Sequence, residues 1–231
     1  MLSRIFDADL DAFVYDEISA LSSGDTEEGL RLNALTDVSS RLAAPRARLV
    51  LAKPLVESHR LGTLLDELEY TRSVWMYRHY RDVVNSNMNR FGADNGFSDI
   101  APILSGDESN WRAVGLTEDT VQTVRGLSQG ALSRDDAAAL FWYARNTHFF
   151  NQDLANEPRV RLQRYADLVS EPAKVMREIY NFAGRDYPGD TILRDVRSSS
   201  VGKGVEIELS EPVRALCEHM LQRLDSHKAT A

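Results

Sequence analysis

The chain has 231 residues, 43% of them hydrophobic, and a formal net charge of −8. This length fits one α/β domain over residues 1–231, with enough apolar side chains to bury a core. The acidic balance argues against a broad surface for nucleic acid or an anionic membrane, although a local basic pocket for a phosphorylated cofactor remains compatible with it.

The single cysteine and the lack of long apolar runs exclude further classes of protein. Cys217 is the only cysteine, so neither an intramolecular disulfide nor a thiolate metal cluster is available, and we expect no metal. No apolar run approaches the ~18 residues of a membrane span. The N-terminus also lacks the charged-then-apolar order of a signal peptide. We therefore expect a soluble, cytoplasmic protein without a transmembrane segment.

Apolar periodicity and turn residues predict strands that alternate with helices. The expected elements are a helix ending near residue 8, a strand at 13–15, a helix over 27–42, a strand at 49–52, a helix over 61–68, a strand at 74–77 followed by a helix, helices over 118–127 and 134–152, a strand at 159–164, and helices over 172–182 and 212–224. Glycine and proline interrupt residues 91–117, and residues 190–208 show no period either, so both regions are expected to be irregular. Strands alternating with helices are typical of a three-layer α/β domain with a parallel sheet.

The segment around residue 78 carries the strongest functional signal. Residues 74–77 are apolar and β-prone, as in a strand covered on both faces. Arg78 follows at the carboxyl end, where open α/β sheets place their ligand crevices. Asp82 suits the first turn of the next helix, and Ser86 lies about 1.5 turns into it. An arginine fork and a hydroxyl converging from these positions suit a phosphate dianion, while the alternative is an arginine that pairs with a carboxylate.

The same segment resembles the 3′-phosphate-binding segment of sulfotransferases that use 3′-phosphoadenosine 5′-phosphosulfate (PAPS). In that family an arginine closes a strand, a serine follows eight residues later, and both hold the 3′-phosphate of the donor. Arg78 and Ser86 stand at the matching positions. The resemblance, to the bacterial type of the family, implies a P-loop-NTPase-like α/β fold.

Two later segments extend the resemblance. Residues 164–172, RYADLVSEP, are similar to the family's "RYEDL … P" signature, with Ala166 where an acidic residue is usual. The tyrosine that matches Tyr165 lies near the donor's adenosine in the family, whereas a strand-end aromatic packed on the next helix is the alternative. Residues 197–204 loosely resemble the late basic loop that closes over the 3′-phosphate, and Lys203 is its candidate cation. Loops of this composition are often simply solvated.

Candidate catalytic residues follow the first two expected strands. Lys53 comes after the strand at 49–52, where the family often carries a lysine near the sulfuryl group. Animal cytosolic members place a catalytic histidine two residues further on, but Leu55 stands there, and His59 is too distant to take that role. Other branches use a glutamate that Glu17 matches, and such a carboxylate removes the acceptor's proton as the sulfur is attacked. The alternative for Glu17 is a solvated carboxylate at a strand end.

The resemblance begins just after the family's first strand and its Gly/Ser/Thr-rich loop, which cradles the 5′-phosphosulfate. We therefore expect the fold to be N-terminally truncated, without that strand and loop. Because a single oxyanion-stabilising donor is worth about 100- to 1,000-fold in rate in other enzymes, the chain is expected to transfer sulfate poorly.

The resemblance implies an enzyme that transfers a sulfuryl group from PAPS to a hydroxyl or amine, leaving adenosine 3′,5′-bisphosphate. The acceptor is expected to be a small or lipid-like molecule, with Phe97 and Trp111 as candidates for shaping its pocket, unless they belong to an ordinary packed loop. The alternative function is a non-catalytic protein that binds a 3′,5′-bisphosphate nucleotide. A nucleotide kinase would call for a lysine-bearing phosphate loop and a magnesium-binding aspartate, which the sequence does not show. The acceptor's identity and the oligomeric state, including a homo-oligomer, stay open.

Overall fold

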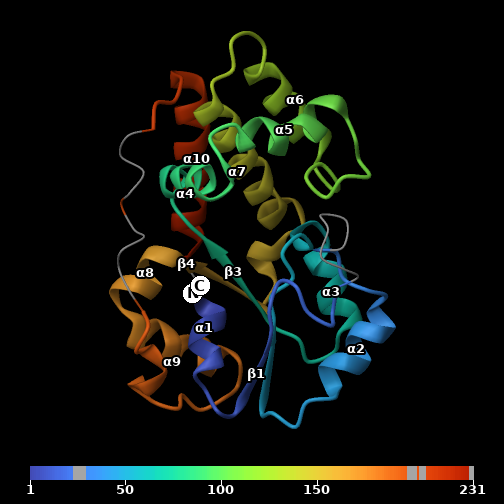
Figure 1. The fold of residues 1–231 in the computed structure, drawn as a ribbon, viewed down its shortest axis with the longest axis vertical. Helices are drawn as coiled ribbons and strands as arrows, with labels where there is room; N and C mark the ends of the chain where they lie inside the picture. The colour runs from blue at the N-terminus through green and yellow to red at the C-terminus, as the bar shows by residue number, and fades with distance from the viewer. Residues whose placement is uncertain (23–29, 197–201, 203–206, 229–231) are drawn as a thin grey trace. The chain divides into compact units, whose positions relative to one another are not determined.

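The computed structural model describes residues 1–22, 30–196, 202 and 207–228 (Figure 1). The strands are β1 (Ala12–Tyr15), β2 (Leu49–Ala52), β3 (Ser73–Tyr77) and β4 (Val160–Arg164). The α-helices are α1 (Leu2–Asp7), α2 (Leu35–Ala43), α3 (Leu61–Glu67), α4 (Tyr80–Phe91), α5 (Asn95–Ser105), α6 (Glu118–Leu127), α7 (Arg134–Asn151), α8 (Tyr165–Ser170), α9 (Pro172–Phe182) and α10 (Glu211–Lys228). Short 3₁₀ helices are η2 (Ser58–Arg60), η3 (Leu154–Asn156) and η4 (Asp190–Leu193).

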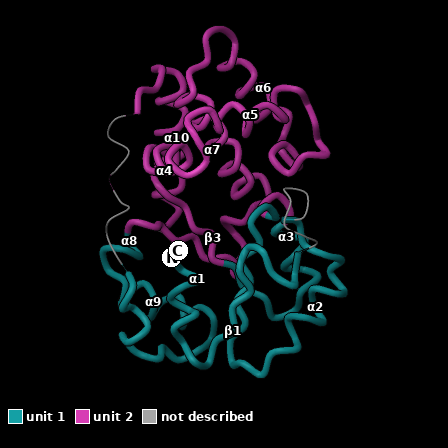
Figure 2. Tube along the Cα trace, viewed as in Figure 1, with its two compact units in different colours: residues 1–57, 61–73, 167–198 teal, residues 58–60, 74–166, 199–231 magenta. Residues whose placement is uncertain are grey.

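The chain forms two compact units whose segments alternate along the sequence (Figure 2). Unit 1 comprises residues 1–57, 61–73 and 167–198. Unit 2 comprises residues 58–60, 74–166 and 199–231. The expectation of one domain over the whole chain stays a prediction.

Unit 1 contains a parallel pair of strands, β1 and β2, in a register that runs from Ala12 opposite Leu49 to Tyr15 opposite Ala52. Both strands are rich in the β-branched, aliphatic and aromatic residues that pack well on a pleated surface. Because the strands are parallel and in register, the residues that follow them emerge at the same edge. This edge therefore brings the two short sequences after β1 and β2 together.

Helix α7 is the centre of unit 2, where it packs against α4, α5, α6 and α10 (Figure 1). It begins at a cap in which the Ser133 hydroxyl accepts a hydrogen bond from the Asp136 backbone N–H at 3.0 Å. Its alanines at 137–139 are buried. A Cβ at Gly96 of α5 would lie 2.7 Å from the Ala138 backbone nitrogen, so only glycine permits this close approach of the two helices.

The expected order of strands and helices is confirmed, with corrections at particular elements. The helix expected over 27–42 begins only at Leu35, and residues 27–29 lie outside the described part. The region 91–117, expected to be irregular, contains helix α5. Its glycines led to the expectation of an irregular region, but they have other roles. Gly96 allows close helix packing, and Gly106, at φ +75°, caps the helix in the left-handed conformation.

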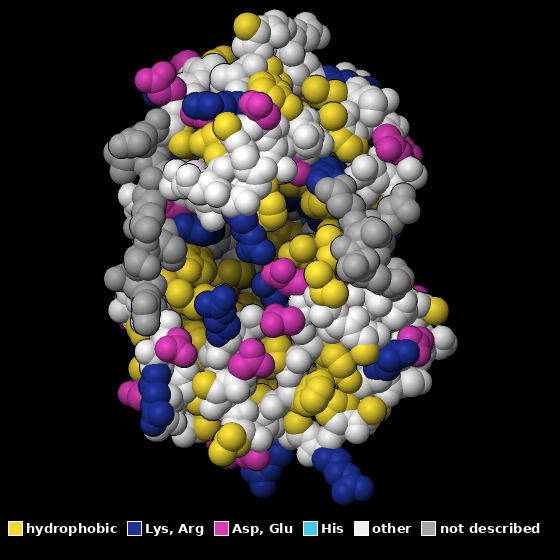
Figure 3. All heavy atoms as spheres, in the orientation of Figure 1, with side chains coloured by type: hydrophobic (Ala, Val, Ile, Leu, Met, Phe, Trp, Pro, Cys, Tyr) yellow, Lys and Arg dark blue, Asp and Glu magenta, His cyan; other side chains and the backbone are white. Residues whose placement is uncertain are grey.

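The α/β class and the parallel strand pair agree with the expectation, but the described strands form two separate two-stranded sheets, β1–β2 and β3–β4. Within the described residues, no helix is long and apolar enough to cross a bilayer. The same residues contain no group of three or more His, Cys, Asp or Glu side chains suited to a metal ion. On the face drawn in Figure 3, Lys and Arg side chains alternate with Asp and Glu rather than forming one continuous basic area.

Candidate functional site

In unit 2, Arg78 and Tyr165 are stacked on one another. They are the first residues after β3 and β4, which are neighbouring strands. The Arg78 guanidinium carbon lies 5.0 Å from the centroid of the Tyr165 ring, a cation–π contact. This contact shows that the two strand ends lie together. The structure therefore brings together two of the residues that the sequence assigned to a nucleotide site.

A buried carboxylate also lies beside Arg78. Asp82, four residues further on in α4, is only 5% exposed, and its Oδ2 lies 3.9 Å from the Arg78 Nε. That separation is longer than a charge-assisted hydrogen bond of about 2.7–2.9 Å, so the pair is a looser electrostatic contact. The same Oδ2 accepts a hydrogen bond from the Gly202 backbone N–H at 3.2 Å. This contact agrees with the alternative expected for Arg78, an arginine that pairs with a carboxylate, and the i, i+4 spacing of opposite charges could have identified Asp82 as that carboxylate.

The strand end that carries Arg78 is held by the surrounding elements of unit 2. The indole N–H of Trp142 in α7 donates to the Arg78 carbonyl oxygen at 3.1 Å. The hydroxyl of Tyr77, the last residue of β3, donates to Asp225 of α10 at 2.7 Å. Burial, and then this hydrogen bond to Asp225, raises the pKa of Tyr77 above its usual value. These contacts fix the backbone on both sides of the guanidinium.

Ser86 and Lys203 are the other two residues that the sequence assigned to the donor site. Ser86 is exposed on α4, one helical turn beyond Asp82 and on the same helix face. Lys203 lies outside the described residues, as does most of the basic loop over 197–204.

In unit 1, the two candidate catalytic residues contact each other directly. Glu17 lies two residues after β1 and Lys53 immediately after β2. The parallel register places both at one sheet edge, where the Lys53 backbone N–H donates to the Tyr15 carbonyl at 2.9 Å. The Lys53 Nζ and a Glu17 carboxylate oxygen form an ion pair, with their side chains 43% and 30% exposed. The Glu17 carboxylate and the Lys53 ammonium group therefore share one accessible edge of this sheet.

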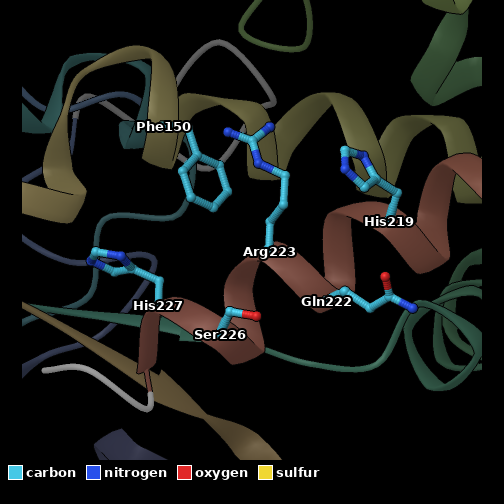
Figure 4. Close-up of a pocket in the computed structure, with 6 residues that line it drawn as sticks. All are labelled: Phe150, His219, Gln222, Arg223, Ser226 and His227. Carbon is cyan, nitrogen blue, oxygen red and sulfur yellow. The ribbon is translucent and has the colours of Figure 1, made fainter.

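A separate hollow of about 460 Å³ lies between α7 and α10 in unit 2 (Figure 4). It is lined by Phe150, His219, Gln222, Arg223, Ser226 and His227. The Arg223 guanidinium carbon lies 4.0 Å from the centroid of the Phe150 ring, as the close-up shows. None of the residues assigned from the sequence lines this hollow.

No family model and no curated protein matches the chain. A solved structure with a similar fold is the sulfotransferase domain from the Synechococcus PCC 7002 olefin synthase, with a TM-score of 0.50 and 17% sequence identity over 82% of this chain and 65% of that domain. Another is the sulfotransferase domain from the curacin biosynthetic pathway, with a TM-score of 0.48 and 16% identity over 79% of this chain and 63% of that domain. The chain spans less than two thirds of either domain. The olefin synthase domain identifies the fold, which agrees with the resemblance seen in the sequence.

Proposed function

We propose that this chain is a sulfotransferase that transfers a sulfuryl group from PAPS to a hydroxyl or amine of a small or lipid-like acceptor. The observation that carries the proposal is the stacking of Arg78 on Tyr165 at the ends of two neighbouring strands. The likeness in fold to a sulfotransferase domain supports the reaction class. A cation for a phosphate dianion and an aromatic ring for an adenosine are the groups that a 3′-phosphoadenosine requires.

Arg78 and Ser86 hold the 3′-phosphate in this proposal, with Lys203 as a further cation and Tyr165 beside the adenosine. The guanidinium is planar and permanently charged, so it binds two phosphate oxygens at once. Asp82 orients the guanidinium through its looser contact at 3.9 Å. Trp142, which holds the Arg78 carbonyl, positions the backbone and does not touch the ligand.

Glu17 and Lys53 supply the chemical step. Sulfuryl transfer is an in-line displacement analogous to phosphoryl transfer, in which positioning and neutralisation of the transferring group's oxygens dominate. The acceptor oxygen or nitrogen bonds to sulfur while the bond from sulfur to the phosphate oxygen breaks. Glu17 takes the acceptor's proton, and Lys53 stabilises the charge that develops as adenosine 3′,5′-bisphosphate departs. Their ion pair places the two groups side by side before the acceptor arrives.

Titration calorimetry with adenosine 3′,5′-bisphosphate tests the donor site independently of turnover. Replacing Arg78 with alanine is expected to weaken binding at least tenfold, because a hydrogen bond to a charged group contributes about 1.5–3 kcal/mol. Arg78→Lys should fall between wild type and alanine, since lysine keeps the charge but loses the fork. Ser86→Ala should weaken binding by less than tenfold, as expected for a single hydroxyl.

The matched control is Arg125→Ala, which removes a cation from α6 of the same unit. Its affinity for the bisphosphate should equal that of wild type. Binding that is unchanged in Arg78→Ala would remove Arg78 from the site and, with it, the observation on which the proposed function depends.

A further inference from the structure

The loop between α5 and α6 in unit 2 holds Trp111 in a fixed position. Two guanidinium groups lie against the ring, with the Arg112 carbon 4.4 Å and the Arg145 carbon 5.4 Å from its centroid. Phe141 of α7 meets the ring edge-on at 5.9 Å. Arg112 is itself buried and donates to Asp99 of α5 at 2.9 Å, which ties the loop to that helix. Trp111 is therefore a rigid part of unit 2.

Arg145 connects Trp111 to a buried histidine. Its Nη1 donates to the Trp111 carbonyl oxygen at 3.0 Å and lies 3.3 Å from the Nε2 of His148, and its Nη2 donates to the Ser58 hydroxyl. A guanidinium can only donate, so the Nε2 of His148 must accept. We call Trp111, Arg145 and His148 the Trp111 cluster.

The protonation state of His148 follows from this contact. The residue is fully buried. Burial first, and then the nearby Arg145 and His59, lowers its pKa to about 3, so the imidazole is neutral at pH 7. A neutral imidazole carries one proton, and because Nε2 accepts, that proton lies on Nδ1. His148 therefore presents an N–H donor at Nδ1.

Two buried donors of the Trp111 cluster have no hydrogen-bond partner among the described residues. They are the indole N–H of Trp111 and the Nδ1–H of His148. A buried donor without an acceptor destabilises the fold, and the large majority of buried polar atoms in folded proteins are paired. Both unpaired donors belong to residues that contact the same guanidinium. An acceptor brought in from outside the chain would satisfy them.

We propose that the Trp111 cluster binds a carboxylate carried by the acceptor substrate. The indole and the neutral imidazole each offer only a donor, and Arg145 adds a positive charge. The complementary group therefore has acceptors only and carries a single negative charge, which describes a carboxylate. The inference rests on the proposed function only in naming the acceptor substrate as the molecule that carries this group.

NMR of the full chain labelled with ¹⁵N-tryptophan tests the site with sodium acetate as the probe. The indole signal of Trp111, assigned by its loss in Trp111→Phe, should shift and saturate as acetate is added. The indole signal of Trp142 should not follow, because that N–H already donates to the Arg78 carbonyl. Acetamide, which is neutral, and sodium chloride at equal ionic strength should leave the Trp111 signal unchanged.

Arg145→Gln is expected to weaken acetate binding about tenfold, because it removes the positive charge beside the two donors. Arg145→Lys, which retains the charge, should weaken it less and keeps the test decisive if the glutamine variant does not fold. Arg125→Gln is the matched control and should bind acetate like wild type. The proposal is overturned if the Trp111 signal does not saturate, if it responds equally to acetamide, or if it responds to inorganic phosphate but not to acetate. None of these readings involves PAPS, so the carboxylate site and the donor site succeed or fail separately.

Discussion

His148 shows at the scale of one residue how burial controls a titratable group. Its ring is enclosed within unit 2 and receives a hydrogen bond from Arg145. Protonating it would place two positive charges side by side in a poorly solvated position. The neutral imidazole is therefore part of the folded state, and protonation has to be linked to unfolding.

The linkage predicts a particular pH dependence of stability. The folded pKa of His148, about 3, lies below the ordinary value of 6.5. Below pH 6.5 the unfolded chain therefore binds a proton that the folded chain does not. The free energy of unfolding should fall as the pH falls from 6.5 towards 3, with a slope of up to about 1.4 kcal/mol per pH unit from this residue. Urea unfolding of His148→Phe between pH 7 and 5, above most carboxylate titrations, should show a flatter profile than wild type.

The control for this measurement is His219→Gln, because His219 is exposed on α10. Its profile should have the wild-type slope. A His148→Phe profile as steep as that of wild type would mean that His148 does not couple protonation to unfolding.

At the scale of an element, helix α7 depends on its first turn. Unit 2 is built around this helix, and Ser133 satisfies one of the backbone N–H groups at its start through the bond from Asp136. Two acidic residues in the first turn, Asp135 and Asp136, also favour the positive end of the helix dipole. The Ser133 hydroxyl thus accepts the hydrogen bond of a backbone N–H that has no partner within the helix.

Ser133→Ala should therefore lower the free energy of unfolding by about 1 kcal/mol, the typical value of an N-cap. Chemical denaturation of both proteins at the same pH measures the difference. Ser40→Ala is the matched substitution, since the exposed Ser40 hydroxyl only donates to the Thr36 carbonyl within α2, and it should change stability by less than 0.5 kcal/mol. Equal losses in the two variants would argue against the cap.

At the scale of the whole molecule, the chain passes between its two units five times, after residues 57, 60, 73, 166 and 198. Strand β3 and helix α8 each begin in one unit and end in the other. If one unit unfolded, the other unit would therefore lose part of β3 and part of α8. This connectivity favours a single cooperative unfolding transition.

The tryptophans allow this cooperativity to be measured. All three, Trp75, Trp111 and Trp142, belong to unit 2, whereas far-ultraviolet circular dichroism reports helices of both units. We expect the two signals to give the same midpoint in urea. Cys217, fully buried on α10, provides an independent reporter of unit 2, because its thiol should react with a labelling reagent only as the tryptophan signal is lost. Distinct midpoints for fluorescence and circular dichroism would show that unit 1 unfolds separately.

Local patterns in the sequence were sufficient for most elements and for the residues at strand ends. Apolar runs, caps and turn residues act over a few positions, so β2, β3 and α7 were predicted close to their observed bounds. Arg78 was identifiable because it directly follows a recognisable strand, whereas Tyr165 and Lys53 were assigned through the resemblance to the sulfotransferase family. Helix α5 was missed because its glycines and proline serve packing and capping, which depend on neighbours far along the chain.

The tertiary structure alone decided which of these residues meet. Glu17 and Lys53, 36 residues apart, form an ion pair only because β1 and β2 are parallel and in register. The contact of Arg78 with Tyr165, and the two unpaired donors beside Arg145, arise from long-range packing. The sequence specifies the chemical type of each residue. Its charge state and hydrogen-bond partners depend on burial and on neighbouring residues, and both are set only when the chain folds.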